Sequence, residues 1–336
     1  MAINTGLASL SEGLWAAATG TYMLAVVAYT GEYAFGRNGR IAQTSAVPTA
    51  VRQPALVGAG PESPPEQPRY GIGSVEQAGP AGQRWGRAAI AFTVLAALFH
   101  LASVAIRGIA VDRVPWGNMY EFTLVVGLMA TVAWLATLVR MPQLRYLGLF
   151  VMMPVLLVMF LAGTLYTKAS KLVPALQSYW LAIHVSSVAV AEGILLTSAA
   201  ITAMYLVRAR FERHVAAGTT PARFAALGSR LPAAGSLDKA AYRTVAFAFP
   251  IYTAGVIFGA IWAEAAWGRY WGWDPKETWA FIAWVIYATY LHARATAGWK
   301  GNRAAYINLL GFGAMTFNFF VVNIVISGLH SYAGLS

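Results

Sequence analysis

Apolar residues in this chain are gathered into eight long runs that are separated by shorter polar segments. A helix that crosses a membrane needs about 20 apolar residues, because it rises about 1.5 Å per residue through about 30 Å of hydrocarbon. Each run is about this long. The pattern predicts an all-α polytopic membrane protein with about eight transmembrane helices, near residues 10–31, 87–107, 122–140, 146–166, 180–206, 242–263, 278–298 and 305–327.

The composition supports a membrane protein and excludes some chemistry. The chain is 58% hydrophobic and only 11% charged, which is too apolar for an ordinary soluble domain. It has no cysteine, so disulfides, thiolate metal ligands and cysteine nucleophiles are excluded, and any thiol chemistry must belong to a partner. No basic leader precedes the first apolar run, so we expect that run to remain as a helix.

Positive charge is distributed unevenly between the connecting segments. Most of the 24 lysines and arginines lie in the alternate segments 37–87, 140–145, 208–243 and 294–303. The positive-inside rule places these segments in the cytoplasm and both termini outside. The net charge of +11 therefore sets topology, and we expect no nucleic acid partner.

Residues 37–86 are rich in proline and glycine and have no apolar periodicity. They predict a flexible cytoplasmic linker between an N-terminal transmembrane helix, residues 1–36, and a seven-helix domain, residues 87–336. We find no internal repeat, which disfavours many transporter folds.

The segment "WGRYWGWDPKETW", residues 267–279, stands at a predicted outer membrane surface. Asp274 as N-cap, Pro275 at the first helical position and Glu277 at the third predict a capping box for the seventh helix. This structural role accounts for the type and spacing of both acidic residues.

Aromatic residues are unusually dense around this segment. Two interpretations are open: an interfacial aromatic belt, or a surface for a flat partner that Gly268 and Gly272 allow to approach closely. The residues concerned, which we call the aromatic plate, are Trp262, Trp267, Tyr270, Trp271, Trp273 and Trp279.

Two of the five histidines lie at the same predicted surface as the aromatic plate. His184 is near the outer start of the fifth helix, and His330 follows the eighth. Each alone is more often structural than a ligand, but together they resemble two axial imidazoles on either side of a large planar cofactor such as haem. His214, in a basic cytoplasmic segment, is most simply a solvated residue.

His100 and His292 are embedded in apolar runs. Ionisable residues inside a membrane are costly, so a function is the default hypothesis. The alternative is that each forms a hydrogen bond with a neighbouring helix.

The outer segment 107–122 carries further candidates for ligand binding. With Arg269 and Lys276, these residues could pair with carboxylates such as haem propionates, although anchoring of helix ends is an equally good explanation. They are Arg113, Trp116, Asn118, Tyr120 and Glu121.

These motifs carry a family resemblance. "WGRYWGWDPKETWAF" resembles the tryptophan-rich WWD signature of haem-handling proteins of cytochrome c maturation. With "VPWGNMYEF", "WLAIHV", "TYLHAR" and "GLHSY" in this order, residues from about 87 to the C-terminus resemble the CcsA family of the System II cytochrome c synthetase.

The resemblance implies a cytochrome c synthase, or haem lyase, subunit that binds haem b externally and joins its vinyl groups to the two thiols of a CXXCH apocytochrome c. His184 and His330 match the external iron ligands, and residues 267–279 match the loop that holds the haem. Within or near this loop, Trp267, Trp271, Trp273 and Asp274 would orient the macrocycle, and further contacts would come from Arg269, Trp279 and Trp116.

The resemblance also assigns the histidines inside the membrane. His292 matches a transmembrane haem ligand. In the family, the opposing ligand is associated with the CcsB (ResB-like) partner, so His100 is either a ligand or structural.

The implied partners are a ResB/CcsB-like membrane subunit, a thioredoxin-like thiol reductase, apocytochrome c and membrane lipid. The implied location is the plasma membrane of a bacterium, with an extracytoplasmic active face. Three alternatives stay open: a haem-delivery protein without ligation activity, a non-haem transporter that uses intramembrane histidines, and a structural membrane subunit.

Overall fold

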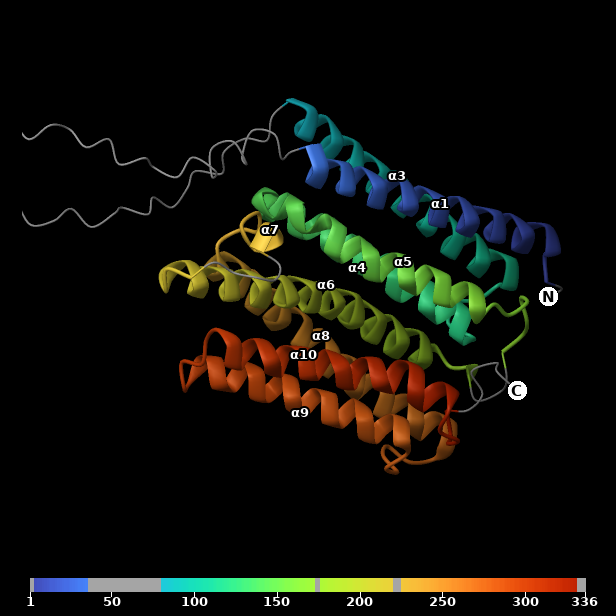
Figure 1. Cartoon of the computed structure of the whole chain (residues 1–336). Helices are drawn as coiled ribbons and strands as arrows, with labels where there is room; N and C mark the ends of the chain where they lie inside the picture. Colours follow the sequence, from blue (N-terminus) through green and yellow to red (C-terminus); the bar gives the residue numbers. More distant parts are fainter. Residues whose placement is uncertain (1–2, 36–79, 173–175, 220–224, 331–336) are drawn as a thin grey trace, which may run out of the picture.

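The computed structural model describes residues 3–35, 80–172, 176–219 and 225–330 of the chain. These residues form an elongated bundle of helices that run side by side (Figure 1). The elements are α1 (Thr5–Phe35), α3 (Pro80–Val111), α4 (Met119–Arg140), the 3-10 helix η1 (Pro142–Leu147), α5 (Gly148–Thr164), α6 (Tyr179–Ala216), α7 (Ala225–Gly228), α8 (Ala234–Trp267), α9 (Pro275–Ala295), α10 (Asn302–Phe317) and the π-helical turn η3 (Asn318–Val322).

The bundle is that of a polytopic all-helical membrane protein, as predicted. Six helical segments in the described part of the chain are long and apolar enough to cross a membrane: Gly82–Val111, Met119–Arg140, Pro142–Thr164, Tyr179–Ala216, Ala234–Trp267 and Asn302–Val322. Helices α1 and α9 stand at the other two predicted positions, but they are less apolar. The count of eight spans and the external position of the termini therefore stay predictions.

Helix boundaries differ from the predicted ones mainly at the basic segments. Helix α6 continues to Ala216 and α8 begins at Ala234, so both extend into the segment predicted to connect them. Helix α3 begins at Pro80, and most of the predicted linker lies outside the described residues. The resemblance also predicts an external WWD loop over residues 264–279, but α8 continues to Trp267 and α9 begins at Pro275, so the connection itself is short.

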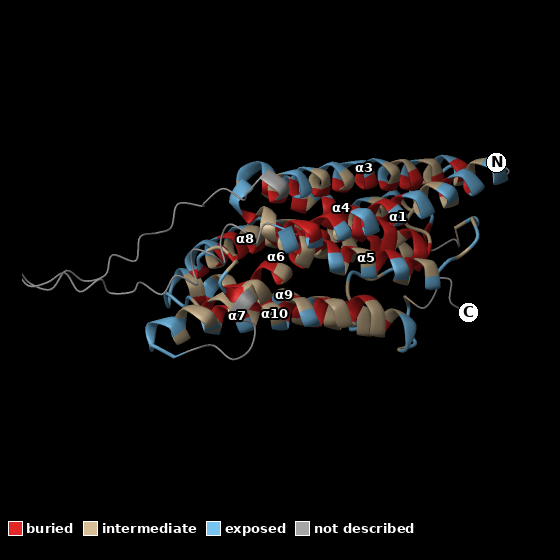
Figure 2. Ribbon diagram, turned by 45° about the horizontal axis from the view of Figure 1, so that its top comes forward, coloured by how far each residue is buried: buried red, intermediate tan, exposed pale blue. Residues whose placement is uncertain are grey.

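The bundle is built from helix pairs that pack against one another. Helix α1 packs along α3, and α6 packs along α8, while α4 joins the two pairs through contacts with α3, α5 and α6. Helices α9 and α10 pack on each other and complete the bundle beside α8 and α6. Buried residues gather on the inner helix faces, and exposed ones lie on the outer faces and at the ends (Figure 2).

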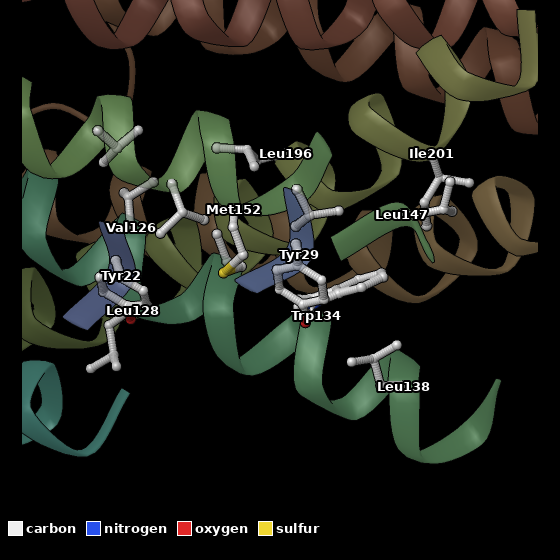
Figure 3. Close-up of a cluster of buried hydrophobic side chains, with 14 of the residues drawn as sticks. Tyr22, Tyr29, Val126, Leu128, Trp134, Leu138, Leu147, Met152, Leu196 and Ile201 are labelled. Atoms are coloured by element: carbon white, nitrogen blue, oxygen red, sulfur yellow. Dashed lines mark hydrogen bonds between the residues drawn. The ribbon is translucent and has the colours of Figure 1, made fainter. Parts of the chain in front are cut away.

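Buried aromatic side chains of α1 hold it against α4 and α5 (Figure 3). The Tyr29 hydroxyl accepts a 3.3 Å hydrogen bond from the Trp134 indole, and the Tyr22 hydroxyl donates one of 3.0 Å to Thr131. Buried tyrosine and tryptophan polar atoms need such partners, because an unsatisfied group is costly in an apolar interior. The N-terminal helix is thus part of the same packed core.

Gly193 of α6 lies where this helix crosses α4, and it permits a close approach of the two backbones. A Cβ at Gly193 would lie 2.6 Å from the carbonyl carbon of Met129 and would also collide with the backbone nitrogen of Ala130. We expect Gly193→Ala to destabilise the fold by about 1–3 kcal/mol, because the helices must separate. Thermal unfolding of the purified protein in detergent measures this loss.

The control is Gly20→Ala in α1, where a Cβ would meet nothing within 4 Å. Its stability should be unchanged or up to about 1 kcal/mol higher, because alanine favours helix. Equal melting temperatures for the two variants would contradict the proposed crossing.

Candidate functional site

The loop between α8 and α9 is fixed by its own backbone contacts. Gly268 ends α8 in the left-handed conformation, with φ 73°, which glycine adopts readily. The predicted capping box of α9 is present: Asp274 accepts a hydrogen bond from Lys276 N–H at 3.2 Å. Glu277 Oε2 accepts from Gly272 N–H at 2.8 Å and from Asp274 N–H at 3.1 Å. These contacts define the course of the backbone between α8 and α9.

Asp274 also binds the segment that follows α10. His330 Nδ1 donates a 2.8 Å hydrogen bond to Asp274 Oδ2, and the Leu329 N–H donates one of 2.8 Å to Oδ1. One carboxylate thus caps α9 and holds a histidine 56 residues away in sequence. Because Nδ1 is engaged, Nε2 is the His330 nitrogen suited to bind a metal.

The protonation states at this contact favour metal binding. Burial lowers the pKa of the His330 imidazole below its ordinary value, although the hydrogen bond to Asp274 acts in the opposite direction. Burial alone would raise the pKa of the Asp274 carboxyl, but the hydrogen bonds from His330 and Leu329 outweigh this effect and lower it. At pH 7 the pair is a neutral imidazole and a carboxylate, and neutral imidazole is the form that binds metals.

His184 has a similar arrangement on α6. Its Nδ1 lies 2.8 Å from the carbonyl oxygen of Gly255 on α8, to which it donates as the N–H tautomer. Gly259, one turn further along α8, makes room for the ring: a Cβ there would lie 2.7 Å from His184 Cε1. The backbone of α8 therefore fixes the imidazole and again leaves Nε2 as the nitrogen suited to a metal.

Tryptophan side chains lie between and beside the two histidines. The buried ring of Trp262 is nearly parallel to His184, at 9° and a centroid distance of 6.0 Å, and lies 5.7 Å from His330. Trp267 lies 5.1 Å from His330 and 4.8 Å from Trp262. The structure thus brings both predicted external histidines together with part of the aromatic plate.

These side chains line a cleft at the end of the bundle. The space inside it that a water-sized molecule can reach is about 160 Å³, and the cleft with its open mouth encloses about 1140 Å³. Ligand pockets commonly measure about 300–1,000 Å³, so the enclosed part of the cleft is smaller than a typical ligand site. Of the candidates from the sequence, the cleft is lined by His184, His330, Trp116, Trp262, Trp267, Tyr270, Trp271, Asn118 and Lys276.

Several other candidates do not line the cleft. Trp273 is 65% exposed and has a positive φ of 58°, and its ring packs against Trp271. The Arg269 guanidinium lies against Gly272, with a Glu277 carboxylate oxygen 3.9 Å away. Trp279 packs on Phe317, with ring centroids 4.2 Å apart.

The remaining histidines also lie away from the cleft. His100 is fully buried, and its Nδ1 lies 3.3 Å from the Tyr22 hydroxyl of α1. His292 is exposed on the surface of α9. His214 is half-buried in the last turns of α6 and contacts Thr219.

An ionic cluster holds the segment before α4 beside the cleft. The buried Glu121 carboxylate pairs with Arg107 at 3.1 Å and Arg113 at 2.7 Å, and it accepts the Gly117 N–H at 2.8 Å. Asn118 caps α4. Glu121 and Arg113, considered above as ligand contacts, are thus engaged with each other, and Tyr120 is buried in the core.

Sequence reasoning missed several polar residues of the cleft, and Asn318 and Asn323 at the end of α10 are two of them. Glu192 of α6 and Tyr252 of α8 both line it. Glu192 could have been found from the sequence, because it is the acidic residue within the apolar run 180–206, where an ionisable group suggests function. Tyr252 gave no such signal, since tyrosine is common in buried helices.

The donor set limits which metal group could bind. No cluster of three or more histidine and acidic residues suited to a metal ion exists among the described residues. A bare transition metal ion would need three or four protein ligands. Two imidazoles are sufficient when the ligand supplies its own equatorial donors, as the porphyrin of haem does.

Fold and site together define an all-helical membrane protein with two oriented imidazoles in a tryptophan-lined cleft. The model of the family "Cytochrome C assembly protein" matches residues 116–330. The chain is 36% identical to the cytochrome c biogenesis protein CcsA of Guillardia theta over 262 residues, which cover 73% of this chain and 85% of that protein. It is 38% identical to CcsA of Synechococcus elongatus over 199 residues, or 49% of this chain and 61% of that protein.

The chain belongs to the CcsA family of cytochrome c assembly proteins. In fold it is similar to the cytochrome c haem lyase CcmF, with a TM-score of 0.57 and 18% identity. That alignment covers 94% of this chain and 46% of CcmF, so the chain spans about half the length of that protein.

Asp274 should contribute to stability as well as to the site. We expect Asp274→Ala to destabilise the fold by about 1–3 kcal/mol, because it removes a helix cap and leaves His330 and Leu329 without their acceptor. Since the pKa of Asp274 is lowered in the folded state, its stabilising effect is present at neutral pH and is lost as the pH falls below about 4. Thermal unfolding at several pH values tests both statements.

Asp112→Asn is the matched control, because Asp112 is exposed and its positive φ of 53° suits asparagine. It should unfold like the wild type. A wild-type melting temperature for Asp274→Ala at pH 7 would show that the carboxylate is dispensable.

Proposed function

We propose that this chain binds haem b between His184 and His330 and promotes its attachment to CXXCH apocytochrome c. The observation that carries the proposal is the pairing of two imidazoles, each with Nδ1 held by a fixed acceptor, in one cleft of a cytochrome c assembly protein. The reaction face is the extracytoplasmic side of a bacterial plasma membrane, in agreement with the distribution of basic residues.

In this proposal the residues of the cleft orient the substrate. His184 and His330 bind the iron through Nε2, Asp274 fixes the ring of His330, and Trp267 and Trp271 pack on the macrocycle. Trp273, which is exposed at the mouth, meets the apocytochrome or the outer edge of the haem. Much of the catalytic effect comes from positioning.

The thiols of the reaction must come from elsewhere, because the chain has no cysteine. In each bond formed, the cysteine sulfur adds to one carbon of a vinyl group and a proton adds to the other. A thioredoxin-like reductase keeps the two thiols reduced, and a ResB/CcsB-like subunit helps to receive the apocytochrome. A chain without thiols cannot be a competing acceptor of the haem.

The other histidines have separate roles in this proposal. His292, exposed on α9, faces the membrane or a partner and receives haem before it reaches the cleft. His100 is structural, since it is fully buried beside Tyr22. Residues 87–336 carry the haem-handling domain, and residues 1–36 and 37–86 are its N-terminal helix and linker.

Absorption spectra of the reduced protein, purified in detergent, test the iron ligands. The wild type should show a bis-histidine haem spectrum. His184→Ala and His330→Ala should change this spectrum and lower the haem content, because each removes one axial ligand. His292→Ala should lower the content without changing the spectrum of the haem that remains.

His214→Ala is the control, because this histidine lies far along α6 from the cleft residues, and it should match the wild type. A wild type that purifies without pigment from haem-replete cells would refute the ligand assignment.

Ligation itself is tested by co-expression with a ResB-like subunit and a CXXCH apocytochrome in a host without its own maturation system. Covalent haem on the apocytochrome, detected after denaturing electrophoresis, should require His184, His330 and both substrate cysteines. Haem bound to the chain without any covalent product would instead support the haem-delivery alternative.

A further inference from the structure

Two ionisable side chains, Glu192 and Lys276, lie on the wall of the cleft without forming an ion pair. On α6, Leu181, Val185, Val188 and Glu192 form one helix face that lines the cleft. Glu192 is eight residues beyond His184, or about 12 Å along the helix axis, and thus marks the inner end of the cleft. Lys276, from the first turn of α9, also lines it and interacts electrostatically with Glu192.

Lys276 has hydrogen-bonding capacity to spare. Its Nζ donates a 3.2 Å hydrogen bond to the Asn318 carbonyl oxygen, and an ammonium group has three donors. Within the described residues, no carboxylate forms an ion pair with it. The cations at the mouth differ, because Arg113 is paired with Glu121 and Arg269 lies beside Glu277.

Glu192 is similarly unsatisfied. Its Oε2 atom is buried and has no hydrogen-bond partner among the described residues. The nearby Tyr252 hydroxyl donates instead to the Ala280 carbonyl, at 3.0 Å. An unpaired charge in an apolar interior is costly, so a ligand that supplied a partner to Lys276 would gain more here than at the surface.

We propose that Lys276 binds a propionate of the haem, and that Glu192 competes with this propionate for the ammonium group. The inference rests on the proposed function and specifies in which orientation the haem lies in the cleft. In protoporphyrin IX the two propionates share one edge, and the vinyl groups lie on the other two pyrroles. A propionate on Lys276 points inward, so the vinyl groups face the mouth, where the thiols of an apocytochrome arrive.

Lys276 stands where it can act on a ligand of both histidines, since its side chain lines the same cleft as His184 and His330. The competition from the Glu192 carboxylate also has a functional consequence. It limits how tightly the substrate is held, and a synthase must release the haem once the haem is bonded to another protein.

Titration of the purified full-length protein with two porphyrins tests the proposal. The probes are ferric protoporphyrin IX and its dimethyl ester, in which both carboxylates are masked, and binding is followed by absorption. The wild type should prefer the diacid by about tenfold. Lys276→Gln should weaken diacid binding about tenfold and leave the ester within about twofold, whereas Glu192→Gln should strengthen diacid binding severalfold.

Two further variants separate this role from a structural one. Lys276→Arg should keep the preference for the diacid, because it keeps the charge. Lys168→Gln, at an exposed lysine that does not line the cleft, is the matched control and should leave the preference unchanged.

The outcomes distinguish the inference from the function on which it rests. Equal weakening of both porphyrins by Lys276→Gln, or no weakening of either, overturns the inference alone. A wild type that binds neither porphyrin overturns the proposed function and the inference together.

Discussion

The Asp274 carboxylate is the interaction on which the geometry of the cleft depends. It caps α9, and it receives hydrogen bonds from Leu329 and His330, which follow the last helix of the bundle. The start of α9 and the chain that follows α10 are far apart in sequence, so chain connectivity alone does not bring them together. Because a buried carboxylate must satisfy its oxygens, the residue that starts one helix also determines where a distant imidazole lies. The second imidazole is held differently, by the α8 backbone, so the two halves of the site are fixed independently.

The ionisable side chains at this end of the bundle are of two kinds: those paired with an opposite charge and those that line the cleft without an ion pair. The arginines around the mouth are engaged with carboxylates, and the Arg107–Glu121–Arg113 cluster supports the segment that carries Trp116. Lys276 and Glu192 both line the cleft, and no ion pair joins them among the described residues. Charges of the first kind hold the walls of the site in place. Charges of the second kind are available to a substrate, and burial makes their interactions stronger.

The sequence was sufficient to predict the helices, because apolar runs report membrane burial directly. It also predicted the capping box of Asp274 and Glu277 and the closeness of His184 to His330, since these depend on local spacing and on which membrane surface each residue reaches. It could not show that Asp274 binds His330, because that contact joins residues 56 positions apart. Nor could it show that Trp273 points outward, or that Lys276 reaches the cleft beside Glu192, because side-chain direction depends on tertiary packing.

The π-helical turn at the end of α10 carries a consequence for how such chains vary. A π turn contains one more residue than an α-helical path of the same course, and it usually arises where a residue has been inserted in a helix. Residues 318–322 form this turn, eight positions before His330. A deletion of one residue there would restore the α-helix and leave the residues beyond it on the same course. His330 would then keep its place beside Asp274, whereas a deletion in the regular part of α10 would rotate everything beyond it by about 100° and move the histidine away.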